Sequence, residues 1–189
     1  MGEEMLGSRI DKSYWAFPKA DSIHGRYSRL VRLGMDHVAG LWPRAKGAAE
    51  SFTYLRFGSF DTYASLADPI SDLSFREERP FWAVIGADDA ALGWVSVCDV
   101  SQTDGAFEIG NIWAAPSLQG RRAARGAIFL LMCLGVTHEG TWRNAVVVDG
   151  WQRHVAWFSI IKAAFTARLD PTHFGPMGFK IELLQDFRG

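Results

Sequence analysis

Hydrophobic and polar positions divide this chain into short elements, most clearly in its middle. Residues 81–85 and 92–100 are rich in Trp, Val and Ile and flank the turn sequence GADDAA, which predicts a β-hairpin. A second turn sequence, SQTDG at residues 101–105, leads to the apolar run FEIGNIW at 107–113. Pro116 should end that third strand, because proline cannot donate a hydrogen bond to the ladder. The pattern therefore predicts three successive antiparallel strands.

After Pro116 the hydrophobic period becomes that of a helix. Apolar residues recur on one face, arginines occupy the opposite face of the first two turns, and the sequence beyond Ala127 is apolar nearly all round. We therefore expect that far end to be buried and Gly135 to cap it. The apolar face comprises Ala123, Ala127, Leu130, Leu131 and Leu134, and the basic face comprises Arg121, Arg122 and Arg125.

The segment before the hairpin predicts an edge strand and two short helices. Residues 25–33 mix Tyr, Leu and Val with arginines, as edge strands often do. Asp36 and Asp61 each precede a helical run and are the expected N-caps. Pro69 should kink or end the second helix, because its ring cannot fit a helix interior without strain.

A last hairpin closes the pattern, and no linker divides the chain. Residues 142–148 and 155–161 predict its strands, with a turn near Asp149-Gly150, a pair that favours the type I′ conformation. The 189 residues suit one domain with long ends. The predicted division is an irregular lead-in at 1–23, the domain at 24–170 and a tail at 171–189.

Composition narrows the class of protein. The 20 Lys and Arg against 21 Asp and Glu exclude a generally basic nucleic-acid binder. Aromatic residues make up 13% of the chain, including 8 Trp, which implies a thick core, a ring-lined pocket, or both. The polar start has no signal-peptide pattern, and no apolar run approaches the ~20 residues that span a membrane. We expect a cytoplasmic protein without a membrane partner.

Common catalytic and metal-binding motifs are missing from the sequence. Neither a G-x-S-x-G elbow, a Walker loop, an H-E-x-x-H nor a C-x-x-C motif occurs. The 5 histidines are scattered without ligand spacing, so we expect no metal. Cys98 and Cys133 both lie in apolar runs and are expected to be buried, reduced thiols.

The junction between the third strand and the long helix is the one candidate site. A helix N-terminus presents unpaired N–H groups and a positive dipole end, which suit a phosphate. Gly120 and the small Ala123 and Ala124 would let a ligand approach the backbone, and three arginines add positive charge. An ordinary strand-to-helix crossover with a solvated basic face explains the same residues equally well.

Four stretches carry a resemblance to a known family. Residues 119–124, QGRRAA, match the acetyl-CoA signature Q/R-x-x-G-x-G/A at its first and last positions, with Arg122 in place of the central glycine. The stretches FTYLRFGSF (52–60), EIGNIWAAPSLQ (108–119) and HEGTWRNAVVVDGWQRHVAWFSII (138–161) occur in the matching order. Over about residues 25–170 the chain resembles the GCN5-related N-acetyltransferases (GNAT), specifically their RimJ/RimL-like branch, in which the change at the central glycine is common.

The resemblance implies an α/β fold with a mixed, mostly antiparallel sheet and helices on both faces. It also implies transfer of an acetyl group from acetyl-CoA to a primary amine, either a small molecule or a protein N-terminus. Glu108 resembles the general base, although it could instead pair with a basic residue across the sheet, and Phe52 and Tyr54 resemble acceptor-binding residues, with core packing as their alternative. The cofactor-binding positions are Ile112, Trp113 and Ala114 for the pantetheine arm, and Gln119, Gly120, Arg121, Arg122, Ala123 and Ala124 for the pyrophosphate.

One departure from the family affects the function. Only about seven residues lie between Leu134 and Trp142, whereas a further strand and helix need at least ~20. The fifth strand and most of the fourth helix of the family are therefore predicted to be missing. This leaves a catalytically inactive CoA-binding or scaffold protein as the alternative, and a ligand-binding domain that uses its aromatic pocket without CoA as a third hypothesis. A sheet edge left open in this way would favour a homodimer.

Overall fold

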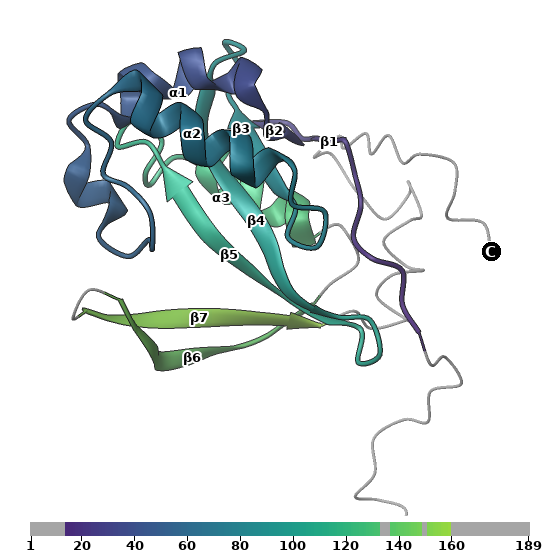
Figure 1. Ribbon diagram of the computed structural model, residues 1–189. Helices are drawn as coiled ribbons and strands as arrows, with labels where there is room; N and C mark the ends of the chain where they lie inside the picture. Colours follow the sequence, from purple (N-terminus) through teal and green to yellow (C-terminus); the bar gives the residue numbers. More distant parts are fainter. Residues whose placement is uncertain (1–13, 133–136, 149–150, 160–189) are drawn as a thin grey trace, which may run out of the picture.

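The fold centres on one antiparallel sheet in the order β1-β2-β3-β4-β5-β7-β6 (Figure 1). The computed structural model describes residues 14–132, 137–148 and 151–159, with only the backbone course described in the last two ranges. Every strand pair in these ranges is antiparallel. The strands are β1 (Ser22–His24), β2 (Arg29–Arg32), β3 (Phe81–Ile85), β4 (Ala91–Ser101), β5 (Ala106–Ala114), β6 (Thr137–Val148) and β7 (Trp151–Ser159).

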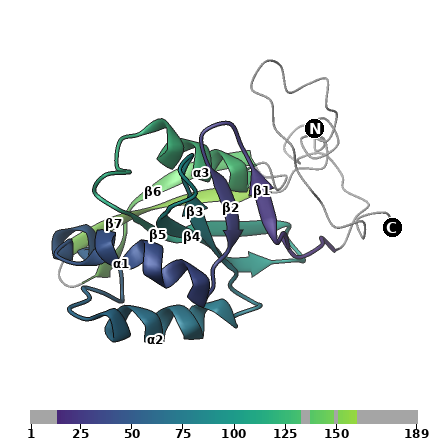
Figure 2. The same cartoon turned by 90° about the horizontal axis from the view of Figure 1, so that it is seen from above.

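Helices cover both faces of the sheet, as predicted for this α/β fold. Helices α1 (Val38–Ala45) and α2 (Tyr63–Ser74) pack on one face, and α3 (Arg122–Met132) lies on the other (Figure 2). Two short 3-10 helices flank α1 in the sequence. η1 (Met35–His37) precedes it and η2 (Ala49–Phe52) follows it. None of the helices in the described ranges is long and apolar enough to cross a membrane.

The core is thickest around the central strands. All five residues of β3 are buried, because helices cover both faces of the sheet at this position. Trp82, Trp94 and Trp113 are among the largest fully buried side chains, which confirms that much of the aromatic excess packs the sheet. Trp82 also donates its indole N–H to the carbonyl of Ala20 at 2.7 Å, which fixes the segment before β1 to the core.

A close approach and a bulge join β4 to β5. A Cβ atom at Gly93 would overlap the carbonyl oxygen of Trp113, so only glycine fits there. Trp94 faces Trp113 and Ser96 faces Gly110, which leaves Asn111 and Ile112 together opposite one residue of β4. This β-bulge places Asn111 at a φ of 48°, in the left-handed region.

The last hairpin joins the sheet over a short distance only. Pairing between β5 and β7 covers Ala106–Glu108, after which the two strands diverge (Figure 1). Val148 pairs with Trp151, so β6 and β7 form a hairpin, and the predicted turn residues Asp149 and Gly150 lie outside the described residues. Both strands begin earlier than predicted, at Thr137 and Trp151.

The strand predicted over residues 25–33 is present only at 29–32, as β2, which forms a hairpin with β1. Gly25 donates its N–H to the carbonyl of Ser28 at 3.0 Å, which turns the chain between β1 and β2. The edge position therefore belongs to β1, which begins at Ser22 inside the predicted lead-in. β1 was not predicted because a three-residue strand leaves almost no periodic signal. The wider division into lead-in, domain and tail stays a prediction.

Both predicted helix caps are displaced. Gly34 is the N-cap of η1 and donates its N–H to Nδ1 of His37 at 3.1 Å. Asp36 lies inside η1. Thr62, not Asp61, caps α2, where its hydroxyl accepts from the N–H of Ser65 at 3.1 Å. The predicted positions differ by one or two residues because several polar residues precede each helix.

The remaining helix predictions are confirmed except at two points. Ala127, Leu130 and Leu131 are buried on α3, as its predicted apolar face requires. Phe129, however, is 38% exposed, so the far end of α3 is not buried all round. Pro69 lies inside α2, which continues to Ser74 instead of ending. Cys98 is buried and not in a disulfide, as expected, whereas Cys133, Leu134 and Gly135 lie outside the described residues.

Replacement of Thr62 by alanine is expected to lower the free energy of unfolding by about 1 kcal/mol, because the first turn of α2 loses its side-chain acceptor. Urea unfolding of the purified protein measures this loss. The matched control is Asp61→Ala, which removes the neighbouring polar side chain and should change stability by less than about 0.5 kcal/mol. Equal losses in the two variants would show that Thr62 is not the effective cap.

Candidate functional site

The site begins where β5 and β7 diverge. Beyond Glu108, the edge of β5 that faces β7 has no partner strand among the described residues, over positions 109–114. At strand spacing this stretch is about 20 Å long. Free backbone N–H and C=O groups on such an edge can pair with an extended ligand.

The predicted pantetheine positions lie on this open stretch. Ile112 exposes 44% of its surface, whereas the side chain of Trp113 is buried, so Trp113 can contribute only its backbone. The bulge beside them is fixed by side chains: Asn111 donates from Nδ2 to the Ser96 hydroxyl at 3.1 Å, and Ser96 donates to the carbonyl of Gly110 at 3.1 Å. Ser96 is fully buried, and these bonds hold the irregular backbone in one conformation.

The far end of the stretch leads into the predicted phosphate loop. Two of its predicted amide donors are used inside the loop, since Gln119 bonds to the carbonyl of Ala115 at 3.2 Å and Arg121 to that of Leu118 at 3.1 Å. Gly120 has a φ of 71°, a conformation that favours glycine. The backbone N–H groups with no acceptor among the described residues are those of Gly120, Arg122, Ala123 and Ala124.

Three arginines surround these free amides. Arg121, Arg122 and Arg125 are exposed, and no acidic residue lies in the first turn of α3. Positive side chains at a helix N-terminus oppose the helix dipole, which prefers negative charge there. The arrangement therefore costs helix stability unless an anion binds, and it fits a phosphate.

A second contribution to this basic surface could not be predicted from the sequence. The β1–β2 turn brings Arg26 and Tyr27 beside α3, where the Arg26 and Arg122 guanidinium carbons lie 5.5 and 5.8 Å from the centre of the Tyr27 ring. The neighbouring Ser28 donates its hydroxyl to the carbonyl of Ala123 at 3.1 Å. These partners are 95 residues apart in the sequence, so no local pattern could have paired them.

Glu108 occupies the point of divergence between β5 and β7. Its exposed fraction is 9%, and its register partners are Cys98 on β4 and Trp157 on β7. Alternate residues of a strand point to the same face, so Cys98, Ser96 and Trp94 share one face of β4. Glu108 therefore lies on the same side of the sheet as Trp94 and its aromatic neighbours.

A group of metal-binding residue types includes Glu108. The Cys98 sulfur and carboxylate oxygens of Asp99 and Glu108 lie within 4.8 Å of one another. Asp99 also lies 3.8 Å from the Arg79 guanidinium, and the Cys98 thiol donates to the carbonyl of Glu108 at 3.7 Å. Ordinary pairing explains this proximity, and nothing further in the described residues indicates a metal there.

Aromatic rings from η2 and from the loop after it pack on β4 and β5. Phe52 stacks on Trp113 with ring centres 4.9 Å apart and planes at 10°, and Phe57 stacks on Trp94 at 6.1 Å. Trp113 donates its indole N–H to the Ser51 hydroxyl at 2.9 Å. Phe52 is 3% exposed, so in this structure it packs in the core, the alternative considered above.

Two polar groups remain near this aromatic cluster. Tyr54 is 49% exposed on the same loop and is available to a ligand. The indole N–H of Trp94 is fully buried and has no hydrogen-bond partner within the described part of the chain. A buried donor without an acceptor costs about 1–3 kcal/mol.

Comparison with solved structures identifies the fold. A GCN5-related N-acetyltransferase from Brucella melitensis superposes with a TM-score of 0.68 at 25% identity, over 84% of this chain and 86% of that one. A probable acetyltransferase of the GNAT family from Chromobacterium violaceum ATCC 12472 gives a TM-score of 0.65 at 22% identity, over 85% and 96%. The microcin C7 self-immunity acetyltransferase MccE, solved with acetyl-CoA and AMP, gives 0.57 at 14% identity, over 71% and 93%. No protein-family model and no curated protein sequence matches the chain.

The packing role of Phe52 predicts a large effect on stability. Phe52→Ala should lower the free energy of unfolding by about 3–5 kcal/mol, because it removes a stacked ring and leaves a cavity. Tyr54→Ala is the matched control on the same loop and should change stability by less than about 0.5 kcal/mol. Chemical denaturation measures both variants, and similar losses would contradict the packing role. If Phe52→Ala does not fold, Phe52→Leu serves with a smaller expected loss.

Proposed function

We propose that this chain, which has the fold of the GCN5-related N-acetyltransferases, transfers an acetyl group from acetyl-CoA to a primary amine and belongs to their RimJ/RimL-like branch. The observation that carries the proposal is the open edge of β5. It runs from Glu108 to the free amides at the start of α3, so one extended ligand could contact a carboxylate at one end and a basic helix terminus at the other.

The residues present fit acetyl-CoA along this path. The backbone of Ile112, Trp113 and Ala114 would pair with the amide groups of the pantetheine arm. Of the predicted pyrophosphate donors, Gly120, Arg122, Ala123 and Ala124 have free N–H groups, while Arg121 and Arg125 would contribute charge. Bound acetyl-CoA supplies the activated thioester. MccE, which shares the fold, was solved with acetyl-CoA and supports this choice of co-substrate.

Glu108 would remove a proton from the acceptor. A primary amine is protonated at neutral pH, because its pKa is near 10, and an ammonium has no lone pair with which to attack. The Glu108 carboxylate lies at the inner end of the open edge, which is the end opposite the phosphate loop. A carboxylate there can accept the proton directly or through one water.

The acceptor would enter beside the loop that follows η2. Tyr54 is exposed there and Phe57 is half-buried, so the loop offers ring surface and one hydroxyl. The unpartnered Trp94 N–H lies behind Phe57 in the same cluster. Both acceptor classes, a small-molecule amine and a protein N-terminus, remain within the proposal.

An inactive CoA-binding or scaffold protein is the second candidate function. Only residues 133–136 separate α3 from β6, which leaves no room for the further strand and helix that the resemblance leads us to expect. One wall of the cofactor groove and the residues it carries would then be missing. The same gap would leave a sheet edge that favours a homodimer.

Acetyl-CoA is expected to bind with a dissociation constant well below millimolar, because its phosphates offset the positive charge at the start of α3. Arg122→Gln should weaken this binding about tenfold, the value of one charge-assisted hydrogen bond. Isothermal titration calorimetry gives the affinities. Arg76→Gln, an exposed arginine after α2, is the matched control and should leave binding unchanged. No heat of binding at millimolar acetyl-CoA would refute both CoA-dependent functions.

Glu108→Gln should reduce kcat/KM by about 10²–10⁴ near neutral pH, because the amide cannot accept a proton. The loss should shrink as pH rises toward the pKa of the amine, since the acceptor then deprotonates in solution. Release of CoA across a panel of amines and N-terminal peptides measures the rate, and calorimetry checks that acetyl-CoA still binds. The control is the exposed Glu78→Gln.

Full activity of Glu108→Gln with an unchanged pH profile would rule out the base role. A wild-type protein that binds acetyl-CoA but releases no CoA with any acceptor would favour the inactive alternative. The two outcomes are distinguishable, because only the second concerns the wild type.

A further inference from the structure

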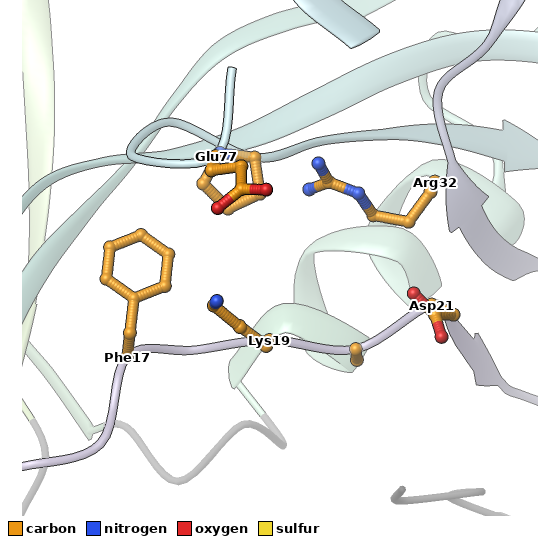
Figure 3. Close-up of a pocket in the computed structure, with 7 residues that line it drawn as sticks. Phe17, Lys19, Asp21, Arg32 and Glu77 are labelled. Atoms are coloured by element: carbon orange, nitrogen blue, oxygen red, sulfur yellow. The ribbon is translucent and has the colours of Figure 1, made fainter. Parts of the chain in front are cut away.

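A separate pocket lies on the β1 side of the sheet, away from the open edge of β5 (Figure 3). Its volume is about 180 Å³, and the segment before β1, strand β2 and the loop after α2 form its walls. Strand β2 is three strands from β5, a distance of about 14 Å at normal strand spacing. The pocket therefore does not belong to the proposed acetyl-transfer site. The lining residues are Phe17, Lys19, Ala20, Asp21, Arg32, Glu77 and Pro80.

The pocket contains two cations and two anions that do not pair. Ion pairs within 4.0 Å among the described residues join Arg29 to Asp89, His37 to Asp36, and Arg79 to Asp99. None of them involves Lys19, Arg32, Asp21 or Glu77. The pocket therefore presents both signs of charge to a ligand.

Arg32 is held in place without being neutralised. Its guanidinium carbon lies 5.5 Å from the centre of the Trp82 ring, and its backbone N–H donates to the carbonyl of Asp21 at 2.9 Å. Burial lowers the pKa of Arg32, while the nearby charges of Asp21 and Glu77 raise it. The guanidinium is thus partly desolvated, and it makes no hydrogen bond to either carboxylate.

The charged groups converge on one space. Figure 3 shows the Arg32 guanidinium, the Lys19 ammonium and the Glu77 carboxylate pointing into the pocket from three different elements. The ring of Phe17 forms an apolar wall beside them, and Pro80 contributes a second apolar surface.

We propose that this pocket binds a small zwitterion of the free α-amino acid class, with its carboxylate toward Arg32 and Lys19 and its ammonium toward Glu77 and Asp21. An anion alone would approach two carboxylates, and a cation alone would approach an arginine and a lysine. A ligand that carries both charges would complement both signs, and an apolar side chain would contact Phe17. The proposal does not depend on acetyl transfer.

Three ligands of similar shape test the requirement for both charges. L-leucine carries an ammonium and a carboxylate, isocaproate lacks the ammonium, and isoamylamine lacks the carboxylate. The indole N–H signals of Trp82 and Trp113 in a nitrogen-15 NMR spectrum distinguish the two sites, because Trp82 lies under Arg32 and Trp113 lies on β5. L-leucine should shift the Trp82 signal in a saturable manner, and both single-charge analogues should bind at least about tenfold more weakly at this signal.

Variants test the assigned residues. Lys19→Gln and Glu77→Gln change exposed side chains and should each weaken L-leucine binding about tenfold. Lys46→Gln and Glu78→Gln are the matched controls, outside the pocket, and should leave it unchanged. Equal binding of L-leucine and isocaproate, a shift of Trp113 instead of Trp82, or an equal loss in the Glu78→Gln control would each overturn the proposal.

Discussion

The contact between β4 and β5 is the constraint on which the rest of the structure depends. Gly93 lets the backbone of β4 approach the carbonyl of Trp113 closely, and the bulge at Asn111 and Ile112 follows within a few residues. A bulge bends its strand and increases the local twist. Because β5 is bent at this point, its second edge can stay paired with β7 only up to Glu108. Gly93 and the bulge therefore explain why β5 is paired with β7 up to Glu108 and has an open edge beyond it.

Aromatic packing connects the bent strand β5 to η2 and the loop that follows η2. Phe52 stacks on Trp113, and Trp113 contacts Trp94 with ring centres 4.7 Å apart. These rings connect η2 to the strand that carries the open edge. Gly58 completes the contact, since a Cβ at this position would lie 2.6 Å from the Phe52 ring. Contacts with buried aromatic rings therefore position the loop beside the candidate acceptor entrance.

Elements with a strong period could be predicted from the sequence, and contacts between distant segments could not. The Trp, Val and Ile content of residues 81–85 and 92–100 indicated the central hairpin, and the apolar face of α3 indicated the long helix. The bulge at Asn111 has no such signal, because it depends on the pairing of β5 with β4. The same holds for Arg26 beside Arg122, since the two belong to elements that meet only in the fold. The candidate cofactor positions therefore stay a prediction, and which of their amides are free could be read only from the fold.

The charges around the two proposed sites differ in a way that their ligands should reflect. At the start of α3 the charged side chains are all positive and exposed, and they stand at the positive end of the helix dipole, where they lower helix stability. An anion would relieve both the repulsion between the arginines and the unfavourable dipole. In the pocket beside β2, two positive and two negative groups line one space. An anion there would be attracted by the positive pair and repelled by the negative pair. Both sign patterns therefore agree with the proposals, since a phosphate would relieve the repulsion at the start of α3 and a zwitterion would complement the mixed charges beside β2.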